Sequence, residues 1–331
     1  MSERLTYRLF EERDLPSLLA LWEEAGWGSL TERQWREWYL ETPFGAALVT
    51  VAVDGAGKVA AQEMFMPSLL KVNGREVRAL RFSAPILRTE LRGRSLRRDE
   101  HPMIGLYKAA AEAASQRGFG VVYSMPEYAW LPIFRLAPRF GVPSFAETSY
   151  GCASLRFESA LGGDSAAGVD EVTARPVAEF GDEYEELWLS AKESFPIECG
   201  VVRGREWLKF RNSGRIAVEV RERASGKLVG YTATKRQTGL LADLLARTCA
   251  DLPRVLAATL RWLASERGAG RVPENLAHLK VMLTPALAAA VEAFDSEPVD
   301  YRFAFTCNTF DADALPLEAL APERWYLMPG D

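Results

Sequence analysis

The run Leu48-Val-Thr-Val-Ala-Val-Asp-Gly-Ala-Gly-Lys-Val-Ala-Ala61 decides the fold, because the chain contains a second version of it. The second version is Ile216-Ala-Val-Glu-Val220 followed by Gly226-Lys-Leu-Val-Gly230. In both versions, two β-rich segments flank a turn that contains glycine. This pattern predicts a β-hairpin, so we expect the same hairpin twice in the chain.

The repeat extends well beyond the hairpin. Trp38 and Gly57 both recur 169 residues later, as Trp207 and Gly226. Further pairs are Arg8 with Arg175, Trp22 with Trp188, Ile86-Leu-Arg-Thr89 with Leu245-Ala-Arg-Thr248, and Gln116-Arg-Gly-Phe-Gly120 with Glu266-Arg-Gly-Ala-Gly270. A repeat of this length indicates a duplicated domain rather than a solenoid of short units.

The chain of 331 residues is long enough for two domains. We expect one domain at 1–158, a linker of small residues and glycine at 159–170, and a second domain at 171–331. In each copy the residue pattern predicts a strand, two helices, three or four antiparallel strands, and then a helix, a strand, a helix and a strand. The Asn73-Gly74 pair predicts a second hairpin in the first copy. The expected class is α/β (α+β), with a mixed, mostly antiparallel sheet flanked by helices in each domain.

Composition limits the function. The net charge of −5 argues against general nucleic-acid binding, which requires a basic surface. Two histidines and four widely spaced cysteines predict no metal site. No apolar run is long enough for a membrane span, and the first residues do not form a signal peptide. We therefore expect a cytoplasmic protein with no nucleic-acid or membrane partner.

One loop of the first copy is suited to binding phosphate. It follows the β-rich segment 81–87, precedes an alanine-rich helix, and contains Gly93 and Ser95, which allow close approach of a ligand to the backbone. Its arginines are suited to bidentate contact with phosphate, and they are Arg88, Arg92, Arg94, Arg97 and Arg98. The alternative is a solvated basic turn in which neighbouring carboxylates pair with these arginines. The second copy has no such loop, since it continues as Cys249-Ala-Asp-Leu-Pro-Arg254.

The ordered set of motifs resembles the GNAT superfamily of acyl-CoA N-acyltransferases, and most closely the tandem-GNAT proteins. The set is a strand, Arg92-Gly-Arg-Ser95, a helix, Gln116-Arg-Gly118, a strand, Pro126-Glu-Tyr128, Phe134-Arg-Leu136 and Phe140-Gly141. The resemblance covers essentially the whole chain. It implies two tandem GNAT-like domains, with acetyl-CoA or another acyl-CoA as co-substrate of the N-terminal one.

The resemblance also implies a cofactor site. The family's pyrophosphate loop reads Gln/Arg-x-x-Gly-x-Gly/Ala, and here it reads Glu90-Leu-Arg-Gly-Arg-Ser95, so that Glu90 departs from the pattern. Leu96–Pro102 is an insertion before the helix. The backbone of Ile86, Leu87 and Arg88 would line the pantetheine arm. Gly93, Arg94 and Ser95, together with Arg92, would hold the pyrophosphate, and Arg97 or Arg98 would reach another phosphate.

Three residues are candidates for catalysis of direct attack by an amine on a thioester. That reaction needs a base, for which Glu63 and Glu127 are candidates, and often an acid, for which Tyr128 is a candidate. The family's acid is frequently a tyrosine at the place where this chain has Phe134. A lone glutamate is more often an ordinary surface carboxylate, and this alternative stays open for both glutamates.

The leading interpretation is an acyl-CoA-dependent N-acyltransferase, in particular an N-acetyltransferase, that acts on a primary amine of a small molecule or a peptide. The alternative is a catalytically degenerate GNAT pair that binds a ligand or a partner, which Glu90, Ser95, the insertion and Phe134 favour. A third reading is a Fem-type transferase that uses aminoacyl-tRNA. The acidic net charge and the lack of an inserted helical arm argue against it.

Overall fold

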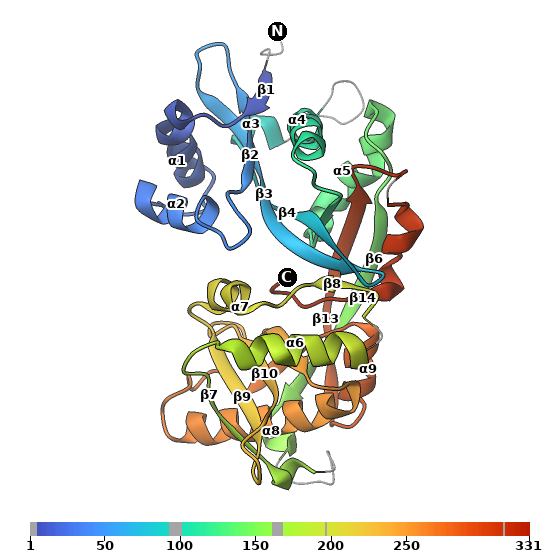
Figure 1. Ribbon diagram of the computed structural model, residues 1–331. Coiled ribbons are helices and arrows are strands. Elements are labelled where there is room, and N and C mark those ends of the chain that lie inside the picture. Colours follow the sequence, from blue (N-terminus) through green and yellow to red (C-terminus); the bar gives the residue numbers. More distant parts are fainter. Residues whose placement is uncertain (1–4, 93–100, 161–167, 196, 314) are drawn as a thin grey trace. The chain divides into compact units, whose positions relative to one another are not determined.

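The computed structural model of the protein describes residues 5–92, 101–160, 168–195, 197–313 and 315–331 (Figure 1). It divides into two compact units, each described by itself below. Unit 1 comprises Met1–Thr148 and Ala304–Ala321, and unit 2 comprises Ser149–Phe303 and Pro322–Asp331. The units therefore do not follow the contiguous division at 159–170 that the sequence predicts, because segments near the end of the chain join both of them.

The two copies contain the same elements in the same order, apart from α3, β8 and β14. The first copy contains β1 (Thr6–Leu9), α1 (Leu15–Glu24), α2 (Glu32–Tyr39), β2 (Leu48–Val53), β3 (Val59–Val72), β4 (Arg75–Leu87), α3 (Thr89–Arg92), α4 (Pro102–Gln116), β5 (Val121–Ser124), α5 (Leu131–Leu136) and β6 (Ala146–Arg156). The second contains β7 (Val172–Pro176), α6 (Asp182–Ser194), β8 (Cys199–Val201), α7 (Arg205–Asn212), β9 (Ile216–Glu222), β10 (Leu228–Thr234), β11 (Leu241–Ala246), α8 (Leu252–Gly268), β12 (His278–Leu283), α9 (Pro285–Val291), β13 (Ser296–Thr309) and β14 (Trp325–Tyr326).

The predicted hairpins form for local reasons. Between β2 and β3, the Asp54 side chain accepts hydrogen bonds from the backbone N–H groups of Ala56 and Lys58, and Gly57 has a φ of 80°. Between β3 and β4, Asn73 and Gly74 both have positive φ, as the tight turn requires. These two turns join β2, β3 and β4 into an antiparallel meander.

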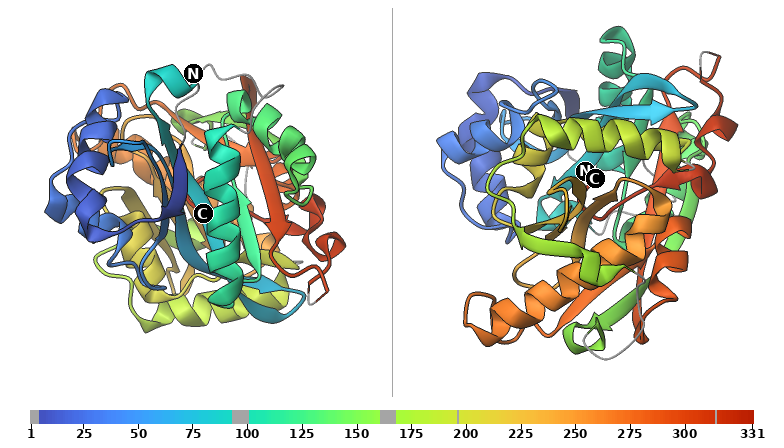
Figure 2. Two further views of the ribbon diagram at one scale, coloured as in Figure 1. Left: turned by 90° about the horizontal axis from the view of Figure 1, so that it is seen from above. Right: turned by 60° about the horizontal axis from the view of Figure 1, so that its bottom comes forward.

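The sheet of unit 1 has the order β1-β2-β3-β4-β5-β13. Its strands are antiparallel except β4 and β5, which are parallel. The two faces of the sheet are covered by different helices (Figure 2). α1 lies on one face, where Trp22 reaches Gln62 of β3. α4 lies on the other face and packs an apolar core with Leu48, Phe65 and Leu80.

Unit 2 contains a four-stranded antiparallel sheet with the order β11-β10-β9-β7. α6 covers one face through the contact of Tyr184 with Tyr231. α8 covers the opposite face, where the Thr259 and Thr232 hydroxyls lie 3.1 Å apart. Beyond β11, an isolated parallel bridge at Leu240 leads to β12.

The last strands of the two copies are exchanged. β6, which ends the first copy, pairs with β12 of the second, whereas β13, which ends the second copy, pairs with β5 of the first. In the latter pairing Thr306 lies opposite Ser124, and their hydroxyls are 2.9 Å apart. The exchange explains why the compact units are not continuous in sequence.

Candidate functional site

β4 and β5 diverge near the middle of the unit 1 sheet. They pair only between Ala79–Arg81 and Val121–Tyr123, although β4 continues to Leu87. A pocket of about 240 Å³ opens where they part. Its lining comes from Arg81–Pro85 on β4, from Ser124 at the end of β5 and Met125–Glu127 after it, and from Trp27 and Trp130. A ligand in this pocket would meet a strand edge and three aromatic residues, Trp27, Phe82 and Trp130.

A β-bulge in β4 shapes this pocket. Gln62 pairs with Ile86 while Met64 pairs with Ser83, so two residues of β4 lie opposite Glu63 alone. One of them, Ala84, has a φ of 47°, which a residue with a side chain rarely adopts. Gln62 donates a hydrogen bond to the Ala84 carbonyl at 3.3 Å. Bulges of this kind recur next to functional sites, where they redirect the strand.

Gln62 is itself held in place by α1. Its side-chain oxygen accepts a hydrogen bond from the indole N–H of Trp22 at 3.0 Å, and Gln62 is buried. The buried amide thus links α1 to the strained residue of the bulge. Sequence reasoning did not identify Gln62, although a polar residue within the apolar run of β3 was a usable signal.

A second cavity lies on the α4 side of the same sheet. The volume in which the centre of a water molecule can lie is about 30 Å³. Its walls are apolar and aromatic apart from Glu63 and Tyr107, and they are Phe82, Met103, Ile104, Trp130, Ile133, Phe134, Ala137, Val142 and Phe145. Phe82 and Trp130 also line the pocket between β4 and β5. The two spaces therefore have these two aromatic residues in common.

Glu63 is buried, with 2% of its surface exposed. Among the described residues, its Oε2 atom has no hydrogen-bond partner. Burial raises the pKa of its carboxyl well above the ordinary value of 4.5. Thr50 lies directly opposite on β2, and its buried hydroxyl also lacks a partner in the described part of the chain. The surface-carboxylate alternative is thus wrong for Glu63.

Tyr107 of α4 is the other ionisable residue in the wall of this cavity. Burial raises its pKa above the ordinary value of 10, and the nearby Glu63 adds to this effect. Its hydroxyl shares a hydrogen bond with the side chain of Asn308. Unlike Glu63, it therefore has its polar atom paired.

The other two candidates for catalysis lie elsewhere. Glu127 is exposed and lines the mouth of the pocket between β4 and β5. Tyr128 follows it, with 45% of its surface exposed, and lies outside the lining of either space. Phe134 packs edge-on against Phe82 and Phe145 in the wall of the cavity on the α4 side. The structure thus separates Glu63 from Glu127 into different spaces.

The first cofactor candidates continue along β4. Ile86 and Leu87 are buried and pair with β3. The backbone N–H of Arg88 donates to the Ala60 carbonyl, and its guanidinium pairs with Asp54 at 2.9 Å. Arg92 donates to the Leu87 carbonyl at 3.1 Å. The other candidates lie outside the described residues, and they are Gly93, Arg94, Ser95, Arg97 and Arg98.

In unit 2, the matching strand edge is covered by the chain itself. By the repeat, Ala242 and Leu244 of β11 correspond to the stretch of β4 that lines the open pocket. Here the N–H of Gly330 donates to the Ala242 carbonyl, and the Tyr326 hydroxyl donates to the Leu244 carbonyl, both at 2.7 Å. The segment after β13 thus fills the position that is open in the first copy.

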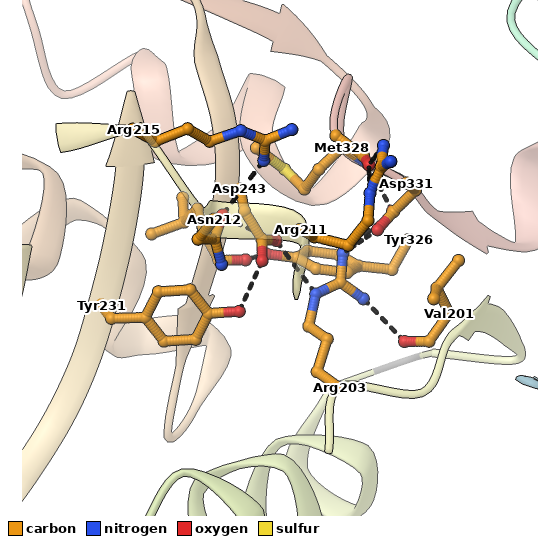
Figure 3. A network of polar contacts seen from close by, with 12 residues as sticks. Val201, Arg203, Arg211, Asn212, Arg215, Tyr231, Asp243, Tyr326, Met328 and Asp331 are labelled. Carbon is orange, nitrogen blue, oxygen red and sulfur yellow. Dashed lines mark hydrogen bonds and ion pairs between the residues drawn. The ribbon is translucent and has the colours of Figure 1, made fainter. Parts of the chain in front are cut away.

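This segment is anchored by a buried charged network (Figure 3). The guanidinium of Arg203, which has no exposed surface, donates to Asp243 at 3.0 Å and to both carboxylate oxygens of Asp331 at 2.9 Å. The Tyr231 hydroxyl donates to Asp243 at 2.7 Å. Burial raises the pKa of Asp331 to about 6, while Arg203 acts in the opposite direction. Sequence reasoning missed the network, although Asp243 within the apolar run 240–246 was a signal.

The described ranges contain no cluster of three or more His, Cys, Asp or Glu side chains that could hold a metal ion. Within the same ranges, no helix has the length and apolar character needed to cross a membrane.

No protein-family model and no curated protein matches the sequence. Several solved structures match the fold. A GCN5-related N-acetyltransferase from Anabaena variabilis ATCC 29413 is 12% identical with a TM-score of 0.64, covering 93% of this chain and 74% of that one. A tandem GNAT protein from the clavulanic acid biosynthesis pathway is 15% identical with a TM-score of 0.52, covering 93% of this chain and 99% of that one.

Saccharomyces cerevisiae N-myristoyltransferase, solved with bound myristoyl-CoA and inhibitors, is a third match. It is 13% identical with a TM-score of 0.58, covering 93% of this chain and 80% of that one. At such low identities these likenesses establish the fold alone. The chain has the GNAT fold, with the mixed sheet and flanking helices that the sequence predicted.

Proposed function

We propose that this GNAT-fold protein is an acyl-CoA-dependent N-acyltransferase whose N-terminal copy carries out the reaction. The observation that supports this most is the pocket where β4 and β5 part, because a bulge held by a buried amide shapes it. A pocket with an unpaired strand edge on one side can hold an extended ligand through backbone hydrogen bonds. The solved structures of similar fold include acetyl- and myristoyltransferases.

In this proposal the donor lies along the first copy's β4. The backbone of Ile86–Arg88 lines the pantetheine arm, and the segment from Arg92 to Arg98 holds the phosphates beside the start of α4. The guanidinium of Arg88 is already paired with Asp54, its N–H donates to the Ala60 carbonyl and its carbonyl accepts from the Leu91 N–H. Its contribution would therefore be packing along the arm. The thioester then lies in the pocket between β4 and β5.

The reaction is direct attack of a primary amine on the thioester carbonyl. A bond forms between nitrogen and the carbonyl carbon, the carbon–sulfur bond breaks, and the amine proton passes to a base. We assign the base to Glu127, because it lies at the mouth of this pocket. The thiolate takes up a proton as it leaves; Tyr128, the sequence candidate for this role, follows Glu127 but lies outside the lining of the pocket. An acetyl group is the simplest acyl group, and the acceptor is a small molecule or a peptide.

Two observations favour a second candidate function, in which the pair of domains binds a ligand or partner without catalysis. Phe134 stands where the resemblance implies a tyrosine, and its ring packs against Phe82 and Phe145 without a proton to donate. The tail that covers β11 shows that one copy already lacks an open edge.

Calorimetric titration with acetyl-CoA tests the proposal. We expect micromolar binding that weakens about 10- to 100-fold in Arg94→Ala, because one charge-assisted hydrogen bond is lost. Gly93→Trp should abolish binding by blocking the loop. Glu127→Gln should bind normally but lower the turnover of an accepted amine about 100-fold or more.

Arg33→Ala is the matched control, because this exposed arginine of α2 pairs only with the neighbouring Glu37 among the contacts described. It should bind acetyl-CoA like the unmodified protein. If the folded protein binds neither acetyl-CoA nor longer acyl-CoAs, the acyltransferase proposal fails and the non-catalytic alternative stands.

A further inference from the structure

The cavity on the α4 side of unit 1 combines an apolar wall with one carboxyl, that of Glu63, whose Oε2 atom has no hydrogen-bond partner among the described residues. Glu63 comes from β3, directly opposite the bulge, and its side chain lies on the same sheet face as α4. The aromatic rings of Phe82, Trp130 and Phe134 surround the rest of the space. These walls suit a hydrocarbon group in chemistry, and a polar group at its end would meet Glu63. The space as it stands has about 30 Å³, roughly the room of one water molecule, so a longer group enters only if wall side chains move.

Two buried oxygens in this region lack partners among the described residues. They are Oε2 of Glu63 and Oγ1 of Thr50, which lie on directly opposed positions of β3 and β2. Side chains at such positions point to the same face of a sheet. Native proteins leave few buried polar atoms unpaired. Of these two residues only Glu63 lines the cavity, so its Oε2 atom is the one that points to a group that binds there.

The apolar surroundings of Glu63 favour a ligand group that carries no charge. In apolar surroundings a carboxyl is held protonated, so that it can donate one hydrogen bond and accept another. A hydroxyl on the ligand offers the same combination. A second carboxylate would carry a charge into the apolar cavity, which costs free energy unless it is paired. Tyr107, the other ionisable residue of the wall, is already hydrogen-bonded to Asn308.

We propose that this cavity receives the acyl group of the donor and favours a short acyl chain that carries a hydroxyl, with Glu63 as the residue that recognises it. The proposal rests on the proposed function. The cavity shares the walls Phe82 and Trp130 with the pocket in which the thioester is placed, so a side-chain movement there would join the two spaces. Glu63 is thus a specificity residue, distinct from the base at the pocket mouth.

The test compares butyryl-CoA with 3-hydroxybutyryl-CoA, which differ by one hydroxyl. We expect the unmodified protein to bind the hydroxylated donor about 10-fold more tightly, because a site built around a hydrogen bond rejects an analogue that lacks it. Glu63→Leu should remove this preference while binding butyryl-CoA at least as well. Glu63→Gln, which keeps a donor and an acceptor, should retain it.

Equal affinities in the unmodified protein, or an undiminished preference in Glu63→Leu, overturn the proposal. A buried water that satisfies Glu63 by itself would give the first of these results. Circular dichroism of both variants checks that they fold, and Glu63→Gln keeps the test valid if Glu63→Leu does not fold.

A second arm separates this proposal from the proposed function. 1-Butanol carries the chain and the hydroxyl without CoA, and its binding is followed by NMR through methyl groups of Met103 and Ile104 in the cavity wall. Shifts that Glu63→Leu abolishes, in a protein that binds no acyl-CoA, support recognition of the hydroxyl and reject the acyltransferase. Absence of shifts together with equal acyl-CoA affinities rejects the cavity as a binding site.

Discussion

The buried guanidinium of Arg203 in unit 2 is surrounded by groups that stabilise its charge. Arg203 has two carboxylates within hydrogen-bond distance and three aromatic rings around its guanidinium, from Trp188, Trp207 and Tyr326. Taking these ions out of water costs free energy that their mutual attraction offsets. Removal of one partner therefore leaves the others uncompensated.

We predict that Arg203→Met lowers the free energy of unfolding by about 3–5 kcal/mol, because Asp243 and Asp331 would remain buried without their cation. Denaturant unfolding at neutral pH measures the loss. Arg205→Met is the matched control, since its pair with Asp182 is exposed and should contribute less than about 1 kcal/mol. Equal losses in the two variants would contradict the role given to Arg203.

Glu63 should make stability depend on pH. Its pKa is raised in the folded protein, so its stabilising contribution is complete below the ordinary value of 4.5 and is lost as the pH rises through the folded pKa. Glu63→Gln cannot ionise. We therefore predict that the stability of this variant relative to the unmodified protein increases from pH 4 to pH 9, as measured by denaturant unfolding across that range. A difference that does not change with pH would show that Glu63 is not held neutral by burial.

At the scale of elements, the two copies repeat even their irregularities. The β2–β3 hairpin shifts register between Ala52 and Val53, and the β9–β10 hairpin shifts at the matching place, before Gly230. The residue equivalent to Gly230 in the first copy is Ala61. A Cβ atom at Gly230 would lie 2.6 Å from the Leu245 carbonyl oxygen and 2.7 Å from Val255. The second copy thus packs β11 and α8 more closely onto this bulge.

Gly230→Ala should therefore destabilise the protein by about 1–3 kcal/mol, because a backbone atom cannot move aside for the added methyl group. Thermal or denaturant unfolding would detect this. Gly55→Ala is the control, since a Cβ atom there meets nothing within 4 Å, and we expect little change. A neutral Gly230→Ala would mean that β10 and β11 can separate at low cost.

For the whole molecule, the exchange of the last strands, β6 and β13, decides which segments of the chain belong to the same compact unit. β13 brings Thr306 and Asn308 into unit 1, where they bond Ser124 and the Pro143 carbonyl at 2.9 and 3.1 Å. β6, whose central part contains Gly151 and Cys152, pairs with β12 and not with β5. A first copy cut at the sequence repeat therefore lacks a strand and leaves an edge of β5 exposed.

We predict that a chain joining residues 1–148 to 304–321 through a flexible linker has a higher melting temperature than residues 1–158. The joined chain keeps the β5–β13 pairing, whereas the shorter chain must substitute its own β6 or leave β5 unpaired. Thermal unfolding by circular dichroism, with NMR dispersion as a check on folding, compares them. If 1–158 is at least as stable, β6 can replace β13 and the exchange adds no specific stability.

The sequence by itself determined the duplication, the order of elements, the two hairpin turns of the first copy and the mixed class of the sheet. These depend on short-range chemistry, namely turn residues with positive φ, alternating apolar positions and helix starts. The sequence also predicted the two strands that flank the candidate pocket, at 81–87 and 121–124. The phosphate-binding loop stays a prediction, because residues 93–100 lie outside the described ranges.

Only the tertiary structure decided the strand exchange, the burial of Glu63 and the network of Arg203. β6 and β13 come from equivalent parts of the repeat, so local pattern could not choose which of them pairs with β5. A lone glutamate in a β-rich run is compatible with either face, and α4 determines that this face is closed. Asp331 meets Arg203 across 128 residues. These long-range pairings depend on which arrangement of the chain buries the most surface while its polar groups stay paired. No local pattern in the sequence contains that information.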